Sequence, residues 1–151
     1  MAGCLILALI SPGVARAQED PQASTASLAL PGLAGAAVGF LGGGLLGMGI
    51  ERSFLPVTGD DPGLRGALIG SGLGSALLAP VAVHAANEGE GSLKVAMLAS
   101  VGAMGASYAA LYVASKALPK SVYPYVLLPT LFVVTPAGEV AASISVLRAT
   151  D

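Results

Sequence analysis

A single carboxylate, Glu139, stands inside a long apolar run close to the C-terminal end of the sequence. An ionisable side chain in such a run is costly in a membrane unless it faces protein or water, so Glu139 is a candidate for a proton site, a cation site or a contact with another subunit. A structural interpretation is favoured over these. Thr135 and Pro136 have the residue types of a helix N-cap and first helical position, and the helix dipole would then favour a charge in the first turn.

Two other chemical candidates are weaker. His84 is the only histidine, which excludes a histidine metal cluster, and it lies at the end of an apolar segment. Both a hydrated interfacial role and a proton-linked role are open for it. Gly42, Gly44 and Gly47 match the G-x-G-x-x-G pattern of dinucleotide-binding loops, but the surrounding segment is apolar throughout and no strand is predicted before it. We therefore expect helix packing and no bound dinucleotide.

The carboxylates Asp60 and Asp61 stand directly before a Pro-Gly pair and an apolar run. This is the composition of a turn that leads into a helix. With Glu51 they could instead bind a cation, but two adjacent carboxylates do not define a coordination sphere. No nucleophile, base and orienting group can be assembled from one histidine and scattered carboxylates, so we expect no enzyme, no metal and no cofactor.

The composition is that of a membrane protein. Apolar residues make up 54% of the 151 residues and charged residues only 11%, whereas a soluble domain carries about 25% charged residues. The net charge is -2 and the few cations are not clustered, which excludes nucleic acid as a partner because phosphate binding needs several clustered cations. Membrane lipid is the expected environment.

Small residues recur every four positions in three apolar segments. Four residues are just over one helical turn, so each series forms a stripe along one helix face. Such stripes let helix backbones approach closely in lipid, where glycine is a common interface residue. The helix-packing residues predicted in this way are Gly35, Gly39, Gly43 and Gly47, then Gly66, Gly70 and Gly74, then Gly102, Ala106 and Ala110.

The apolar segments predict an all-α membrane protein of about four transmembrane helices packed through these faces. The spans are expected at about 28–50, 64–86, 95–115 and 122–147, and the first is roughly 34 Å long, enough to cross a core of about 30 Å. The fourth span contains three prolines, for which a kinked helix is expected and a broken or re-entrant helix stays open. A β-barrel is disfavoured because the segments do not alternate.

The N-terminal region predicts export of the chain. Residues 1–17 combine an apolar stretch with the small-x-small motif of Ala15 and Ala17, as in a cleaved signal peptide, although no basic residue precedes the stretch. An uncleaved anchor and lipidation at Cys4 are the alternatives. Residues 18–27 read as a short polar leader. Cleavage would leave the mature chain without cysteine and hence without disulfides or thiolate sites.

The connectors predict the orientation. With an exported N-terminus, four cations lie on the cytoplasmic side and two outside, in weak agreement with the positive-inside rule; they are Arg52, Arg65, Lys116 and Lys120 against Lys94 and Arg148. Four tyrosines lie near the cytoplasmic turn, where they would form an interfacial belt: Tyr108, Tyr112, Tyr123 and Tyr125. We expect a multi-pass protein of a bacterial membrane, with the inner membrane favoured.

The Gly35 to Gly47 and Gly66 to Gly74 runs resemble the glycine-zipper segments of small bacterial envelope and membrane proteins. This resemblance covers about a third of the chain and implies helix packing or self-association, in a homo-oligomer or a larger membrane complex. Two function classes follow from the sequence. The favoured one is a non-enzymatic structural or assembly protein, and the alternative is a small channel or transporter that uses Glu139, with His84 as a further candidate residue.

Overall fold

In the computed structural model, residues 24–54 and 63–150 are described, and this part of the chain is helical without any strand. Its four long apolar helices are each long enough to cross a membrane, so the predicted all-α membrane fold is confirmed. The predicted signal peptide, the start of the leader and the Asp60–Asp61 pair lie outside the described residues. The elements are α2 (Thr25–Phe54), α3 (Leu64–Ala86), α4 (Leu93–Ala117), α5 (Tyr123–Pro129), η1 (Thr130–Val134) and α6 (Thr135–Ala149).

The fourth span is one helical run that contains a π-helical turn. The π-helix η1 joins α5 to α6, and the residues on both sides of each junction have right-handed helical dihedrals. The expected helix start at Thr135 is therefore wrong, and so is the alternative of a broken or re-entrant segment. The Thr135 hydroxyl donates to the carbonyl of Thr130 at 2.9 Å, one π-turn earlier, and caps nothing. A kink at the prolines stays a prediction.

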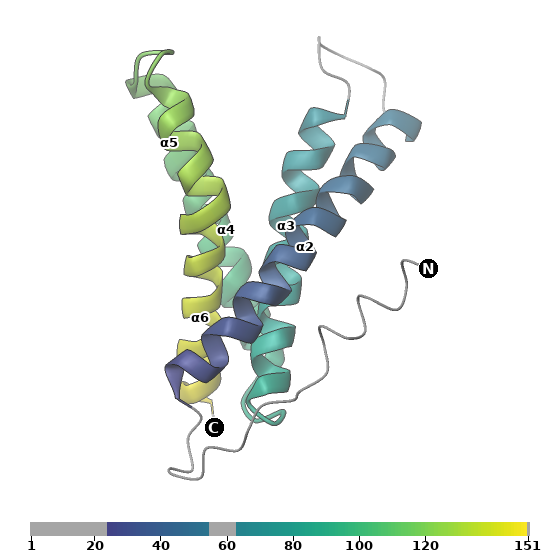
Figure 1. The fold of residues 1–151 in the computed structure, drawn as a ribbon, viewed down its shortest axis with the longest axis vertical. Helices are drawn as coiled ribbons and strands as arrows, with labels where there is room; N and C mark the ends of the chain where they lie inside the picture. Colours follow the sequence, from purple (N-terminus) through teal and green to yellow (C-terminus); the bar gives the residue numbers. More distant parts are fainter. Residues whose placement is uncertain (1–23, 55–62, 151) are drawn as a thin grey trace.

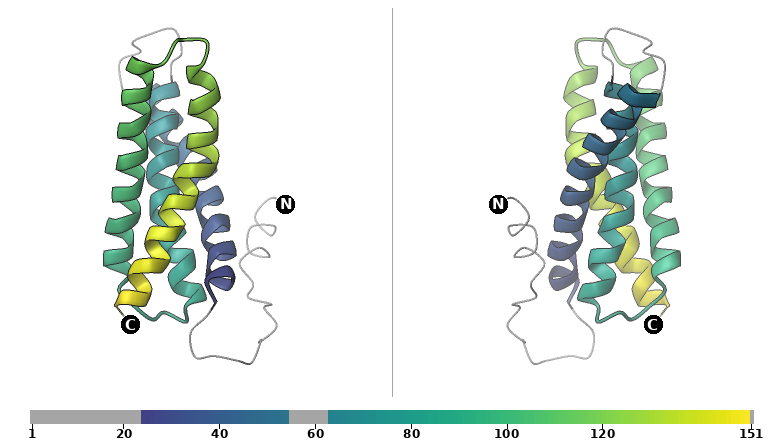
Figure 2. Two further views of the ribbon diagram at one scale, coloured as in Figure 1. Left: turned by 90° about the vertical axis from the view of Figure 1, so that its left-hand side faces the viewer. Right: turned by 90° about the vertical axis from the view of Figure 1, so that its right-hand side faces the viewer.

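The four spans form two antiparallel pairs, α2 with α3 and α4 with α5–η1–α6 (Figures 1 and 2). The pairs lie closest at the end where α3 turns into α4, called here the α3–α4 end. They diverge toward the opposite α4–α5 end (Figure 1). The buried apolar core lies toward the α3–α4 end, and α5, at the opposite end, has no buried residue. Its members come from all four spans: Leu28, Ala36, Ala79, Val83, Ala96, Val140, Ile144 and Leu147.

Between α2 and α3 the backbones themselves meet. A Cβ added at Gly39, Gly43 or Gly47 would come closer to an α3 carbonyl oxygen than real Cβ atoms ever do. The converse holds for Gly66, Gly70 and Gly74, whose added Cβ atoms would strike carbonyl oxygens of α2. At Gly35 the added Cβ would lie 2.6 Å from the carbonyl oxygen of Leu78. These contacts leave no room for a side chain along the stripe.

The α4 stripe has different surroundings. Gly102, Ala106 and Ala110 are exposed in the described chain, and a Cβ added at Gly102 would meet no atom within 4 Å. No helix among residues 24–54 and 63–150 therefore covers this stripe. A packing role for it is a prediction about contact with a second chain.

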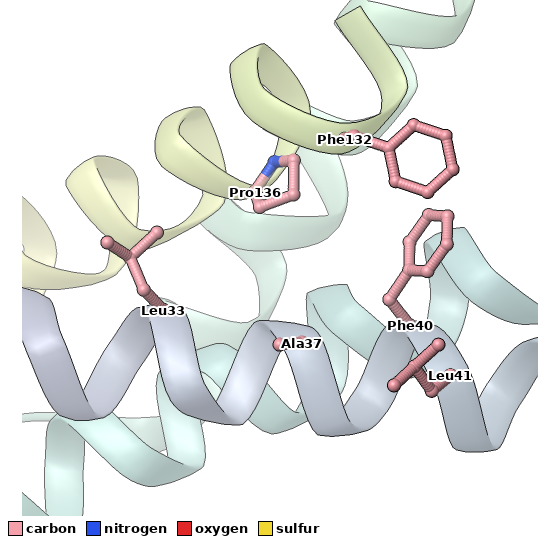
Figure 3. Close-up of a pocket in the computed structure, with 6 residues that line it drawn as sticks. All are labelled: Leu33, Ala37, Phe40, Leu41, Phe132 and Pro136. Carbon is pink, nitrogen blue, oxygen red and sulfur yellow. The ribbon is translucent and has the colours of Figure 1, made fainter. Parts of the chain in front are cut away.

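The two helix pairs also touch through apolar side chains between α2 and the fourth span. The rings of Phe40 and Phe132 lie with their centroids 5.1 Å apart, at an angle of 50°. Beside them is a shallow apolar recess of about 270 Å³ (Figure 3). Its lining comes from α2, η1 and α6: Leu33, Ala37, Phe40, Leu41, Phe132 and Pro136.

We expect Leu at Gly39 or Gly43 to destabilise the protein by about 3 kcal/mol or more, because overpacking against backbone cannot be relieved by a side-chain rotation. Gly49→Leu is the matched control, since an added Cβ there meets nothing within 4 Å, and its effect should stay within about 0.5 kcal/mol. Thermal unfolding of all three variants in one detergent measures the difference. Equal shifts at the three positions would contradict a glycine-packed α2–α3 interface.

Candidate functional site

Glu139 is the buried carboxylate of the bundle, with an exposed fraction of 0%. It lies on the face of α6 that also buries Val140, Ser143 and Ile144. The side chain therefore points into the protein. An ionisable group inside a span is expected to face either protein or water, and Glu139 faces protein. A contact between Glu139 and another subunit is excluded by this burial.

One oxygen of the Glu139 carboxyl group has a partner on a neighbouring helix. The Ser75 hydroxyl of α3 donates to Oε2 at 2.5 Å, and both side chains are fully buried. The same hydroxyl lies 3.4 Å from the carbonyl oxygen of Gly72. Because a serine hydroxyl has one proton, it can donate fully to only one of these two acceptors at a time. Ser75 can therefore turn between Glu139 and its own helix.

The other carboxyl oxygen has no such partner. Glu139 Oε1 is buried and receives no hydrogen bond from any residue that the structure describes. Ser100 of α4, which is also fully buried, likewise has a hydroxyl without a partner among the described residues. Buried polar atoms are nearly always hydrogen-bonded, so an unpaired one marks a place where a proton, water or ligand could be bound. A first-turn position cannot explain the charge at Glu139, since α6 directly continues the helical run of α5 and η1.

Tyr108 of α4 lies next to the α3 segment that carries Ser75. Its hydroxyl donates to the carbonyl of Leu68 at 2.7 Å. Gly72 makes this position possible: a Cβ there would lie 2.7 Å from the tyrosine hydroxyl and 3.0 Å from the Met104 sulfur. Gly72 does not belong to the Gly66–Gly74 stripe and faces α4 instead of α2.

The structure does not bring His84 to Glu139. His84 follows Ser75 by nine residues, which is about 13 Å along α3 toward the α3–α4 end. Its Nδ1 lies 3.1 Å from the carbonyl oxygen of Glu90, where Asn87 also donates at 3.3 Å. His84 thus belongs to the turn between α3 and α4, and the two residues do not form one site.

Glu51 has a structural partner. Its carboxylate accepts a hydrogen bond from the backbone N–H of Gly66, near the start of α3. This N–H is one of those that a helix start leaves without an internal partner. Among the described residues no group of three or more His, Cys, Asp or Glu side chains could hold a metal ion.

Three residues of this site escape sequence reasoning. Ser75 and Gly72 lie among many small residues in an apolar segment, and Tyr108 stands close enough to the Lys116–Lys120 turn to suggest an interfacial belt. A hydroxyl within a span is a weak signal by itself. Combined with a lone carboxylate in another span it becomes more informative, because buried polar groups need partners.

No protein-family model matches the chain, and the searches of curated proteins and of solved structures found no similar protein. The function is therefore inferred from the site and its surroundings.

We expect Ser75→Ala to lower stability by about 1–2 kcal/mol, because Glu139 would lose its one described side-chain donor while staying buried. Ser145→Ala is the control. Its hydroxyl is exposed and donates to the carbonyl of Ala141 at 2.8 Å, so its removal should leave stability within about 0.5 kcal/mol. Thermal unfolding in detergent compares the two. A control as damaging as Ser75→Ala would remove the evidence for a special Ser75–Glu139 bond.

Proposed function

We propose that the chain is a non-enzymatic integral membrane protein with a structural or assembly role, held together by tight glycine-mediated helix packing. The four apolar helices indicate a membrane protein. The observation that carries the proposal is the backbone contact between the glycines of α2 and α3. We further propose a bacterial inner membrane with the N-terminus exported, on the strength of the N-terminal sequence and the positions of the cations.

The glycine contacts favour a rigid α2–α3 hairpin. Glycines on both helices face carbonyl oxygens of the other helix, so the contact is made from both sides along about two turns of α2, from Gly39 to Gly47. Lipid tails are as apolar as leucine, so the hydrophobic effect does not drive helices together in lipid. Their association depends instead on close packing of this kind. A rigid hairpin of this kind is a suitable building block for a larger complex.

Assembly with a second chain would need a different surface, because the α2 and α3 stripes are already in contact with each other. We propose the exposed stripe of Gly102, Ala106 and Ala110 on α4 for this contact. No atom of the residues that the structure describes lies within 4 Å of a Cβ added at Gly102, which supports an open face. Homo-oligomerisation and incorporation in a larger membrane complex are both compatible with it.

A tagged mature chain purified in mild detergent tests the assembly proposal. We expect a defined oligomer or complex that Gly102→Leu weakens by about tenfold or more, since a large side chain would separate the helices. Gly42→Leu is the control, because an added Cβ at Gly42 also meets nothing within 4 Å but lies on α2. A monomer without co-purifying proteins would contradict the assembly role.

A second candidate function, a small channel or transporter, is favoured by the buried carboxyl group of Glu139. Its Oε1 atom is buried without a described partner, although such a group is costly to keep inside a membrane protein. Carboxylates in this situation commonly mark proton or ion pathways.

Flux measurements in proteoliposomes test this second candidate. We expect the wild-type protein to show a pH-dependent proton or cation flux, and Glu139→Gln to abolish it, because Gln keeps the size of the side chain but cannot exchange a proton. Both proteins should have the same oligomeric state and similar thermal stability. Absence of flux from the wild-type protein would leave only the structural role.

A further inference from the structure

The glycine packing of α2 against α3 does not account for a glycine at Gly72 or for the position of the Tyr108 side chain. Gly72 faces α4 and leaves the space in which the Tyr108 hydroxyl lies against α3. The Tyr108 hydroxyl thus lies beside Gly72, whose carbonyl oxygen is 3.4 Å from the Ser75 hydroxyl. Gly72 therefore connects Tyr108 of α4 with the hydrogen-bonded pair of Ser75 on α3 and Glu139 on α6.

The bundle is closed on one side of this point. Toward the α3–α4 end, α6 buries Val140, Ile144 and Leu147 against the apolar core. Beyond the core, the Arg148 side chain donates to Thr25 at 2.9 Å, and the Ser92 N–H donates to Thr150 at 2.8 Å. A proton moving in this direction would cross a fully buried apolar layer.

The bundle is looser on the other side. Toward the α4–α5 end, α5 buries none of its residues and residues 64–70 of α3 are exposed or half-buried. The two helix pairs diverge in this direction (Figure 1). Tyr108 is half-buried, and the next tyrosine along α4, Tyr112, is 66% exposed. The Tyr108 hydroxyl contacts Leu68, which precedes Ser75 by seven residues on α3, so it lies on the α4–α5 side of the Ser75–Glu139 pair.

The number of free acceptors favours a proton as the ligand. A metal cation such as Na⁺ or Ca²⁺ needs several oxygen ligands, and the described buried side-chain oxygens without a partner are only Glu139 Oε1 and Ser100 Oγ. A proton needs one acceptor, which Oε1 supplies. The Ser75 hydroxyl can donate to Oε2 when the carboxylate is charged and turn to the Gly72 carbonyl when it is neutral.

We infer that Glu139 is a proton-exchange site reached from the α4–α5 end past Tyr108, and that Gly72 is the positioning residue for the Tyr108 hydroxyl. Protonation forms one O–H bond on Glu139 Oε1 with a proton from water, and deprotonation returns it to water by the same route. The inference shares Glu139 with the proposed transport function but does not require net flux, because exchange from one side is sufficient.

Few other charges face this site. The titratable or charged side chains described on α2 are Glu51 and Arg52, and those on α3 are Arg65 and His84, all near helix ends. On α4 the facing group is Tyr108, while Lys94, Tyr112 and Lys116 lie toward the ends. On the fourth span, Tyr123, Tyr125 and Arg148 lie at the two ends. Proton uptake at this level of the bundle is therefore assigned to Glu139.

Hydrogen–deuterium exchange of the carboxyl group, followed by infrared spectroscopy in lipid bilayers, tests the inference. The band of Glu139 is the carboxyl band that Glu139→Gln removes. We expect Tyr108→Phe, which keeps the ring and removes the hydroxyl, to slow its exchange by about tenfold or more. Tyr112→Phe, one turn further along α4, should exchange at the wild-type rate. Gly72→Ala should slow exchange as well, because its Cβ would displace the tyrosine hydroxyl.

The direction of the change separates this role from a structural one. A variant that merely loosens the bundle opens more often and exchanges faster, whereas loss of the proton path slows exchange. Exchange in Tyr108→Phe at or above the wild-type rate would overturn the inference. So would the absence of any carboxyl band sensitive to Glu139→Gln between about pH 4 and pH 9. Normal exchange without flux would reject transport and leave the exchange site in place.

Discussion

The close approach of α2 to α3 constrains the rest of the structure. Where glycines of one helix face carbonyl oxygens of the other, no side chain separates the two backbones, so the pair behaves as one unit. The large side chains of both helices then point away from this seam. Many of them are exposed to the surroundings of the bundle, among them Leu41, Leu45 and Ile69. Such a surface suits lipid and would be unfavourable in water.

The remaining helices pack against this unit mainly at one end. The apolar core lies toward the α3–α4 end, where Leu28, Val83 and Leu147 are almost fully buried. At the opposite end the two pairs separate, and α5 contributes nothing to the buried core. Glu139 lies at the transition between these halves. A carboxyl group in this position is shielded by the apolar core on one side and faces the less tightly packed half of the bundle on the other.

The proposed structural and transport roles would use different parts of the same molecule. Packing of α2 against α3 involves their glycine faces, whereas the surroundings of Glu139 use Ser75 and Gly72 on other faces of α3 and Tyr108 on α4. The central helix α3 therefore serves two neighbours at once. This division of one helix into a glycine face and a hydroxyl face allows a tightly packed protein to hold a polar site without opening the α2–α3 seam.

The sequence by itself determined the helical membrane class and the approximate extent of the four spans, because apolar length and small-residue periodicity are local properties of the chain. It also singled out Glu139, since a charge inside an apolar run is visible without a structure. The local residue types gave a wrong prediction at Thr135: they indicated a helix N-cap, but a π-helical turn continues the helix through this position. Only the tertiary structure decided which side chains surround Glu139 and that His84 is not among them. Those contacts join residues far apart in the sequence, and their geometry depends on how whole helices pack.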